Sequence, residues 1–341
     1  MTVVESSPAD LSSWPAERLR QMLFDMIQAR RNSERFFALQ RQGRAGTSAP
    51  ITGQEATAVG AAHALDPTID WIVPQYREQV ALARFGEEIL ATHCLYNRGH
   101  PEGGSYPEHV RVFPAQISLA AQIPQALGLA WGMQIKKEQG VVGVFFGDGS
   151  SSEGDFYEAG NFAGVLKAPL IMILVNNQWA ISTPTSKQTA AVTFADKAKA
   201  FGMPGFRVDG NDVIAVHDAV AAARVRALAG EGPTLIEAYT FRMGFHTTAD
   251  DPSRYVPEDQ AREWAQRDPI PRFTSQLAAA GLWTSEDSAT ALQRADETLD
   301  RLFAVAEANH PMPDAFFDHV YANPPQRLLD QRAAFNEGRT Q

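Results

Sequence analysis

Two short apolar runs, separated by one helical stretch, constrain the fold more than any other feature of the sequence. The runs cover residues 141–146 and 170–175 and are rich in β-branched and aromatic side chains. Runs of this length and composition are typical of strands buried on both faces. Residues 155–167 between them predict a helix, which Pro169 would end. Strand, helix, strand is the repeating unit of a parallel sheet, so we expect an α/β fold.

The same alternation continues toward the C-terminus. Residues 206–208 predict a strand, residues 212–229 a helix and residues 234–239 another strand. The last third of the chain is polar and mostly helical in pattern. We therefore expect one α/β domain over residues 13–341, a parallel sheet flanked by helices, with helical extensions at both ends and a loose leader at residues 1–12.

The N-terminal extension is predicted as one long helix over residues 14–42. Ser13 could cap it, Pro15 would lie in its first turn, and Gly43 could end it. Its apolar side chains share one face, which could pack on this chain or on a partner: Leu19, Met22, Leu23, Met26 and Ile27.

Composition excludes several classes of function. The 341 residues carry a formal charge of −10 without a long basic run, which argues against nucleic-acid binding. One cysteine, Cys94, allows neither an intrachain disulfide nor a cysteine metal cage. The N-terminus has no signal-peptide pattern, and no apolar run of about 18 residues predicts a membrane span. We expect a cytoplasmic protein with no membrane partner.

Polar residues follow both central strands. Asp148 comes directly after the first strand and Asn177 after the second. Neighbouring parallel strands lie about 4.8 Å apart, so the crossover brings these side chains together in the crevice where open α/β sheets bind ligands. Carboxylate and amide oxygens suit Mg²⁺, and Gly147 and Gly149 would let phosphates approach the backbone. The spacing is compatible with a magnesium–diphosphate site or with a simple turn after a strand.

The segment GDGSSSEGDFYEAGNFAGVLKAPLIMILVNNQWAISTP resembles the thiamine diphosphate signature of the alpha subunits of 2-oxo acid dehydrogenases. The similarity continues in PQYRE, AAQIPQALG, KQTAAVTFADKAKAFGMPGFRVDG, GEGPTLIE and FRMGFHTTADDPSRY, and it covers roughly residues 15–330. It implies a thiamine diphosphate-binding fold and two cofactors, thiamine diphosphate and Mg²⁺.

The resemblance also implies roles for individual residues. Asp148, Asn177 and the backbone carbonyl of Trp179 would bind Mg²⁺, although the family more often has Tyr or Phe at position 179. His246 and Arg242 would be the catalytic residues at the mouth of the site. The implied cofactor contacts, some of them shared with the metal, are Tyr76, Arg77, Leu119, Gly147, Asp148, Gly149, Ser150, Asn177 and His246.

The family activates its cofactor with a glutamate from a separate beta subunit, and we find no candidate for it in this chain. The resemblance therefore implies an α2β2 heterotetramer, inactive without its beta subunit, that decarboxylates a 2-oxo acid and passes the acyl group to a lipoyl acyltransferase core. We favour pyruvate as substrate, with a branched-chain 2-oxo acid (2-oxoisovalerate) or acetoin as alternatives. A non-catalytic scaffold subunit is the alternative from another class, whereas the chain is too short for a single-chain thiamine enzyme.

Two further features of the family, a potassium site and a phosphorylation site, depend on single positions in this sequence. Gln116 and Ala121 replace the Ser and Thr that bind potassium in the branched-chain enzymes of animals, so no potassium site is predicted there. Thr247 stands where animal enzymes carry a phosphorylated serine, and nothing in the sequence indicates that it is modified.

Overall fold

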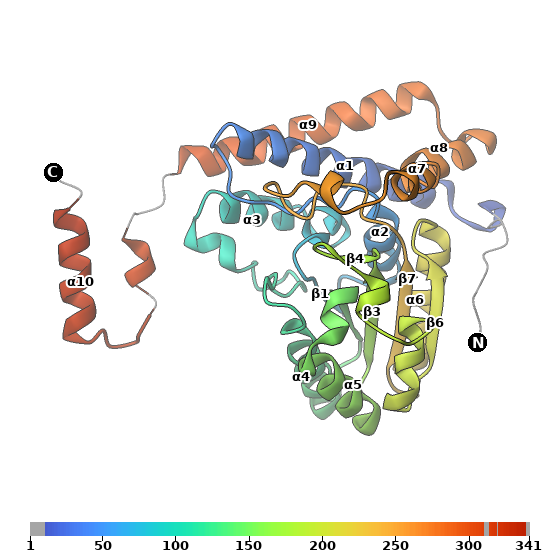
Figure 1. Ribbon diagram of the computed structural model, residues 1–341, viewed down its shortest axis with the longest axis horizontal. Helices are drawn as coiled ribbons and strands as arrows, with labels where there is room; N and C mark the ends of the chain where they lie inside the picture. Colours follow the sequence, from blue (N-terminus) through green and yellow to red (C-terminus); the bar gives the residue numbers. More distant parts are fainter. Residues whose placement is uncertain (1–10, 310–313, 319, 339–341) are drawn as a thin grey trace.

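A five-stranded parallel sheet forms the centre of the computed structural model, which describes residues 11–309, 314–318 and 320–338 (Figure 1). The strand order is β1-β2-β3-β7-β6, and every neighbouring pair is parallel. The predicted α/β class is therefore confirmed. The strands are β1 (Trp71–Val73), β2 (Val142–Gly147), β3 (Leu170–Asn176), β6 (Gly205–Asp209) and β7 (Thr234–Tyr239).

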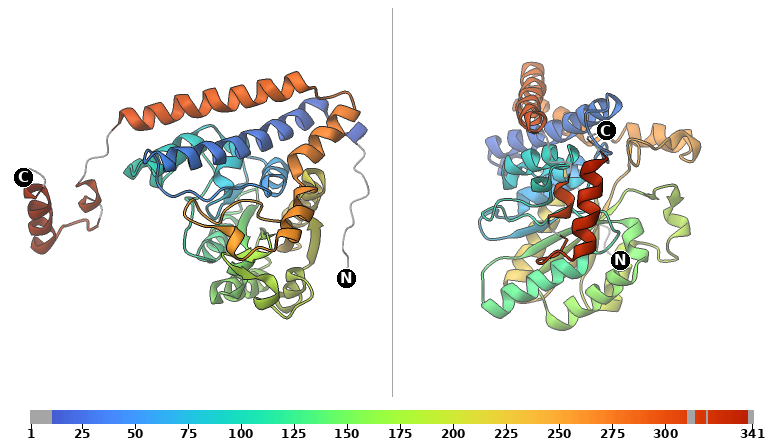
Figure 2. Two further views of the ribbon diagram at one scale, coloured as in Figure 1. Left: turned by 45° about the horizontal axis from the view of Figure 1, so that its top comes forward. Right: turned by 90° about the vertical axis from the view of Figure 1, so that its left-hand side faces the viewer.

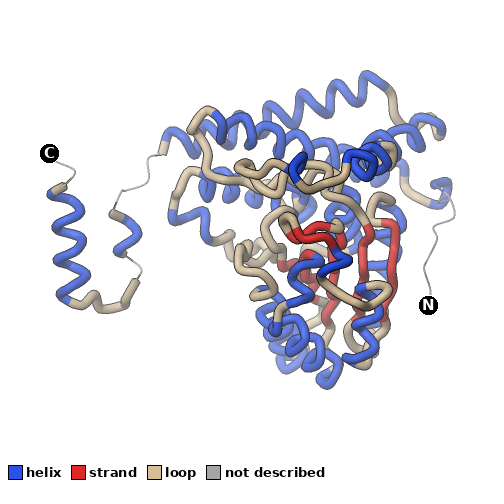
Figure 3. Tube along the Cα trace, viewed as in Figure 1, coloured by secondary structure: helices blue, strands red, loops and turns tan. Residues whose placement is uncertain are grey.

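Helices cover both faces of the sheet, as the tube coloured by secondary structure shows (Figure 3). Alternate side chains point to opposite faces of a strand. Val144 and Phe146 of β2 therefore join the core under α4 (Gln122–Lys136) and α5 (Gly154–Leu166). Phe145, between them, joins the core under α2 (Glu55–Ala64) and α6 (Val213–Leu228). Burial on both faces explains the continuous apolar runs in the sequence.

The register of the sheet brings strand ends level at its carboxyl edge. Gly147, the last residue of β2, lies opposite Val175 of β3, and Asn176 lies opposite Tyr239 of β7. The residues that follow β2 and β3 therefore emerge side by side. A short antiparallel hairpin, β4 (Trp179–Ala180) and β5 (Thr183–Pro184), follows β3 at this edge.

The long N-terminal helix α1 (Ala16–Arg41) packs on its own chain. Its predicted apolar face is buried against α2 and α8 (Pro269–Ala279), so of the two alternatives the face packs within this chain. The predicted start was wrong: Ser13 belongs to a separate 3-10 turn (Leu11–Ser13), and Pro15 is the N-cap residue with no side-chain hydrogen bond. Pro15 has no side-chain oxygen, so it cannot accept from the free N–H groups of the first turn as Ser13 was expected to do.

The C-terminal extension is helical, as predicted. Helix α9 (Ser285–Ala308) runs along α1, and ion pairs join the two helices from Arg31–Asp296 to Arg44–Glu307. In Figures 1 and 2 the last helix, α10 (Gln326–Glu337), stands away from the body, and none of its residues is buried. The remaining helices are α3 (Glu88–Asn97) and α7 (Glu258–Ala265).

The predicted leader lies mostly outside the described residues, because the description begins at Leu11. Across the ranges that are described, every helix is too short or too polar to cross a lipid bilayer.

Candidate active site

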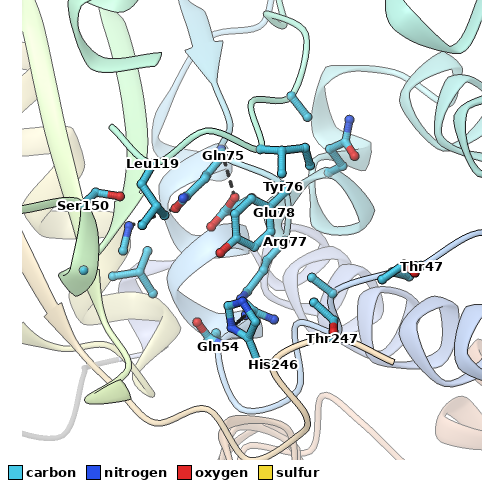
Figure 4. Close-up of a pocket in the computed structure, with 18 of the residues that line it drawn as sticks. Thr47, Gln54, Gln75, Tyr76, Arg77, Glu78, Leu119, Ser150, His246 and Thr247 are labelled. Atoms are coloured by element: carbon cyan, nitrogen blue, oxygen red, sulfur yellow. Dashed lines mark hydrogen bonds between the residues drawn. The ribbon is translucent and has the colours of Figure 1, made fainter. Parts of the chain in front are cut away.

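A cavity of about 670 Å³ opens at the carboxyl edge of the sheet, beside the ends of β2 and β3. Figure 4 shows side chains from several separate segments pointing into it. The cavity brings together all but one of the site residues predicted from sequence: Tyr76, Arg77, Leu119, Gly147, Asp148, Gly149, Ser150, Asn177, Trp179 and His246. The exception is Arg242, which does not line it.

Asp148 begins a 3-10 turn (Asp148–Ser152) directly after β2, and only 1% of its surface is exposed. Its Oδ2 accepts a hydrogen bond of 2.6 Å from the Gln188 side-chain amide. Burial raises the pKa of Asp148 to about 6, although the Gln188 hydrogen bond opposes the shift. Buried charges are normally paired, yet in the described part of the chain no cation forms a direct ion pair with this carboxylate, and Arg242 and Arg77 act on it only at longer range.

Asn177 and Trp179 present further oxygens beside Asp148. The Asn177 amide donates to Gln54 Oε1 at 2.9 Å, and its Oδ1 accepts from the Trp179 N–H at 3.2 Å. Between them Gln178 has φ +71°, a turn that redirects the chain from β3 into the hairpin. The Trp179 carbonyl accepts from Arg242 Nη1 at 3.0 Å.

The donor set fits Mg²⁺ bound with a diphosphate. No three His, Cys, Asp or Glu side chains among the described residues gather to hold a metal, so a metal here would need the amide and backbone oxygens as well as Asp148. Hard oxygen donors of this kind, completed by phosphate oxygens and water, are what Mg²⁺ prefers. Ser150 Oγ is buried at the same turn without a hydrogen-bond partner, which leaves it available to a ligand.

The turn after β2 also makes close backbone contact with the hairpin. A Cβ atom at Gly149 would lie 2.8 Å from the Ala180 Cβ, closer than side chains pack. Glycine therefore lets the two segments form one wall of the cavity.

Arg77 and His246 lie next to each other in the wall of the cavity (Figure 4). Arg77 is 6% exposed and donates to Pro50 O at 3.0 Å and to His246 Nδ1 at 2.8 Å. Burial, Arg77 and Arg242 lower the pKa of His246 to about 4, so its ring is neutral near pH 7. Because Nδ1 accepts from Arg77, the proton of the neutral ring belongs on Nε2.

Arg242 lies behind His246 and ties two loops together. It is 3% exposed, donates to the carbonyls of Trp179 and Ile181, and donates to Tyr255 OH at 2.7 Å. Its Nη1 also lies 3.4 Å from His246 Nδ1. The structure thus places Arg242 where it supports the hairpin and the His246 loop, one residue removed from the cavity.

Tyr76 and Leu119 line the wall near Gln75. The guanidinium of Arg77 lies 5.3 Å from the centre of the Tyr76 ring. Leu119 is 42% exposed on a loop before α4, so its side chain is open to the cavity rather than packed in the core.

Sequence reasoning missed three glutamines that organise this edge. Gln188 holds Asp148, Gln54 holds Asn177, and Gln75 accepts from the Gly147 N–H at 3.1 Å. Gln75 and Gln188 both lie inside segments already singled out, PQYRE and KQTAAV, so these motifs contained a usable signal. Gln54 had none, because only the fold brings the start of α2 to the end of β3.

Comparison with known proteins gives one consistent family. A family model described as the dehydrogenase E1 component matches residues 25–314. The chain is similar to the pyruvate dehydrogenase E1 component subunit alpha of Staphylococcus epidermidis, with 41% identity over 325 residues, 94% of this chain and 87% of that protein. The protein of the same name from Bacillus cereus is 41% identical over 337 residues, 98% of this chain and 90% of that protein.

Proposed function

The chain belongs to the dehydrogenase E1 component family, and we propose that it is the alpha subunit of a pyruvate dehydrogenase that binds thiamine diphosphate and Mg²⁺. One observation supports the binding site above all others. A single cavity collects residues from separate segments of the chain, and they are the residues that the resemblance to this family had singled out. The names of the relatives favour pyruvate over 2-oxoisovalerate or acetoin.

Asp148, Asn177 and the Trp179 carbonyl would hold Mg²⁺, and the metal would hold the diphosphate. Their oxygens are of the hard type that this ion selects, and among the described residues no cation pairs directly with the Asp148 carboxylate, on which Arg242 and Arg77 act only at longer range. Arg77 and Tyr76 would bind phosphate oxygens from the other side, because a guanidinium and a phenol are both donors. Gly147, Gly149 and Ser150 would line the phosphate path along the backbone.

Thiamine diphosphate, when bound, supplies the electron sink for decarboxylation of the 2-oxo acid. The chain's own residues would orient the reactants and control protons. His246 is neutral and carries its proton on Nε2, so it would donate a hydrogen bond into the cavity while Arg77 fixes its ring. Arg242 would keep the loop of His246 in place. Leu119 would support the cofactor from its apolar side.

The alpha-subunit name of the relatives implies a beta subunit as partner, and an exposed apolar surface on this chain fits such a partner. On α4 and α5, four large apolar side chains are exposed to solvent: Trp131 at 41%, Ile135 at 66%, Phe162 at 48% and Val165 at 71%. Contiguous apolar patches of this kind mark protein interfaces. We propose an α2β2 assembly in the cytoplasm that delivers its acyl group to a lipoyl acyltransferase core.

Calorimetry on the chain with its beta subunit tests the cofactor site. Thiamine diphosphate should bind only when Mg²⁺ is present, and Asp148→Ala should abolish binding. Binding that is unaffected by Asp148→Ala, or no binding at all, would support the scaffold alternative. Decarboxylation of pyruvate and of 2-oxoisovalerate, and cleavage of acetoin, by the reconstituted pair would then decide the substrate. Pyruvate should give the largest kcat/KM, and a preference for either of the others would refute that part.

A further inference from the structure

A second cavity, of about 560 Å³, lies away from the carboxyl edge of the sheet. Helices α1 and α9 form one side of it, and they run side by side in the left view of Figure 2. The other side is the segment from the 3-10 turn Glu78–Ala81 to the first turn of α3. Nothing in the function proposed above uses this space.

The α1 side of this cavity is a row of polar side chains where a packed helix would normally be apolar. Gln21, Asp25, Gln28 and Asn32 recur at the spacing of one helical face and line the cavity over roughly 16 Å. Asp25, Gln28 and Asn32 are all at least nine-tenths buried. Both Oδ1 and Nδ2 of Asn32 are without a hydrogen-bond partner, although the residue is only 1% exposed. Buried amides are rarely left in this state, so Asn32 faces the cavity as an unfilled donor and acceptor.

Two cations at this cavity have no direct ion-pair partner among the described residues. Asp25 is bonded to His63 and to the Gln21 amide, and Glu87 is paired with Arg301. Within the described part of the chain, neither Arg84 nor Arg294 forms an ion pair. Both are exposed at the solvent side, and the Arg294 guanidinium lies over the Phe24 ring at 4.4 Å. The cavity therefore joins a cationic mouth to an interior of amides, in which the carboxylate of Asp25 is bonded to His63 and Gln21.

We propose that this cavity binds a phosphorylated sugar or polyol. A phosphate monoester carries close to two negative charges, which matches the two guanidinium groups. Hydroxyl groups both donate and accept, which matches the amides of Gln28 and Asn32 and the hydroxyl of Thr298 along the interior. A free sugar lacks the group for the arginines, and inorganic phosphate lacks the carbon chain whose hydroxyl groups would bond to the amides.

The position of the cavity couples it to the active site. Gln79 lines both cavities, and its amide accepts from His93 and donates to Tyr106 on the active-site side. It follows Tyr76 and Arg77 in the chain by only three and two residues. A ligand that contacts Gln79 and Val80 would therefore change the affinity for thiamine diphosphate, a consequence that rests on the function proposed above.

Calorimetry with glucose 6-phosphate as the probe tests the site on the assembled enzyme, saturated with thiamine diphosphate and Mg²⁺ so that the active cavity is occupied. We expect glucose 6-phosphate to bind, and glucose and inorganic phosphate each to bind at least about tenfold more weakly. Arg294→Ala and Asn32→Leu should each weaken binding at least about tenfold, whereas Arg262→Ala, an exposed arginine on α7, should not.

Three outcomes would overturn the proposal. They are no binding of glucose 6-phosphate at millimolar concentration, binding unchanged in Arg294→Ala, and inorganic phosphate binding equally well, which would mean an anion patch only. Arg294 is exposed, so its variant will fold even if Asn32→Leu does not. Titrating the chain assembled with its beta subunit separately with each ligand distinguishes the two proposals: glucose 6-phosphate binding without any thiamine diphosphate binding to that assembly would refute the function and leave this site standing.

Discussion

Glu55 and Asp148 are both carboxylates withdrawn from water, yet their partners differ. Glu55, at the start of α2, is fully buried and accepts from Arg30 Nε at 2.5 Å, from Arg30 Nη2 at 3.0 Å and from the Gly53 N–H at 3.0 Å. Asp148 has only the neutral amide of Gln188 on its Oδ2. Burial alone would lower the pKa of Arg30, but Glu55 and Asp268 raise it above its usual value. The first carboxylate is paired directly with an arginine, whereas the second, among the residues that the structure describes, has no directly paired cation.

The same contrast extends to the regions around the two carboxylates. The helical layer of α1, α2 and α9 pairs its charges through arginines, with Arg30, Arg31, Arg35 and Arg44 all bonded to acids. The carboxyl edge of the sheet holds buried polar atoms without partners, among them Ser150 Oγ and Arg242 Nε. Unpaired buried polar atoms destabilise the chain. The edge is thus organised for a ligand, whereas the arginine pairs of the helical layer stabilise the chain, with Asn32 at the second cavity as an exception in that layer.

The largest effect is expected when the satisfied pair is broken. Arg30→Met would leave Glu55 and Asp268 without their shared cation. Removing one member of a buried ion pair destabilises a protein by about 3–5 kcal/mol, because the other charge stays buried. Urea unfolding of the chain at pH 7.5 measures the loss. A change below about 1 kcal/mol would show that Glu55 is protonated or solvated, contrary to the contacts described.

Asp148→Asn should have the opposite effect on the chain without ligands. The raised pKa of Asp148 means that the folded state binds the proton more tightly than the unfolded state, so stability falls as pH rises from about 4 to about 6. The asparagine variant lacks this loss and should be more stable at pH 7.5 by about 1–3 kcal/mol. Mg²⁺-dependent binding of thiamine diphosphate should weaken about 100-fold or more. A destabilised variant that still binds the cofactor would contradict both parts.

Gln188→Leu tests whether the amide orients the carboxylate. With Oδ2 bonded to Gln188, Oδ1 is the oxygen left for a metal, and the variant frees Asp148 to rotate. Loss of a group that orients a metal ligand typically weakens metal binding by 10–100-fold. Mn²⁺ affinity in the presence of thiamine diphosphate, followed by electron paramagnetic resonance, gives this value directly. Gln134→Leu, at an exposed amide on α4, is the control and should leave the affinity unchanged.

His246→Asn should change the pH dependence of stability in a defined window. The lowered pKa means that the folded state takes up a proton only near pH 4, whereas the unfolded state does so near pH 6.5. Stability from this residue is therefore lost as pH falls from about 6.5 to about 4. The asparagine variant should lose less stability than the wild type between pH 7 and pH 4.5 in thermal unfolding. Equal losses would mean that the His246 ring is not buried beside Arg77 and Arg242 in solution.

The smallest effect is expected at the exposed end of the helical layer. Arg44→Ala removes the ion pair with Glu307, in which the two side chains are 46% and 30% exposed. Exposed pairs contribute about 0–1 kcal/mol and are screened by salt. The variant should match the wild type within that range in urea unfolding, and the difference should vanish at 1 M NaCl. A loss of stability as large as that of Arg30→Met would show that the exposure of an ion pair does not determine how much it stabilises the chain.

The sequence predicted the long strands of the sheet, but it did not predict the short strands of two or three residues. The strands at 141–146, 170–175 and 234–239 follow from burial on both faces, and β2, β3 and β7 match them to within one residue at each end. Strand β1 was missed because Trp71–Val73 is only three residues long and carries no periodicity. The hairpin of β4 and β5 was missed for the same reason, with two residues in each strand.

The sequence by itself determined that two polar residues follow neighbouring parallel strands, because burial forces apolar runs into the sheet and places Asp148 and Asn177 at the same edge. Only the tertiary structure decided which groups meet them. Gln54, Gln188 and Arg242 come from distant segments, and a contact between segments far apart in the chain leaves no local pattern. The same reason explains why Glu55 and Asp148, both acids at the start of helical turns, could be told apart only when their surroundings were known.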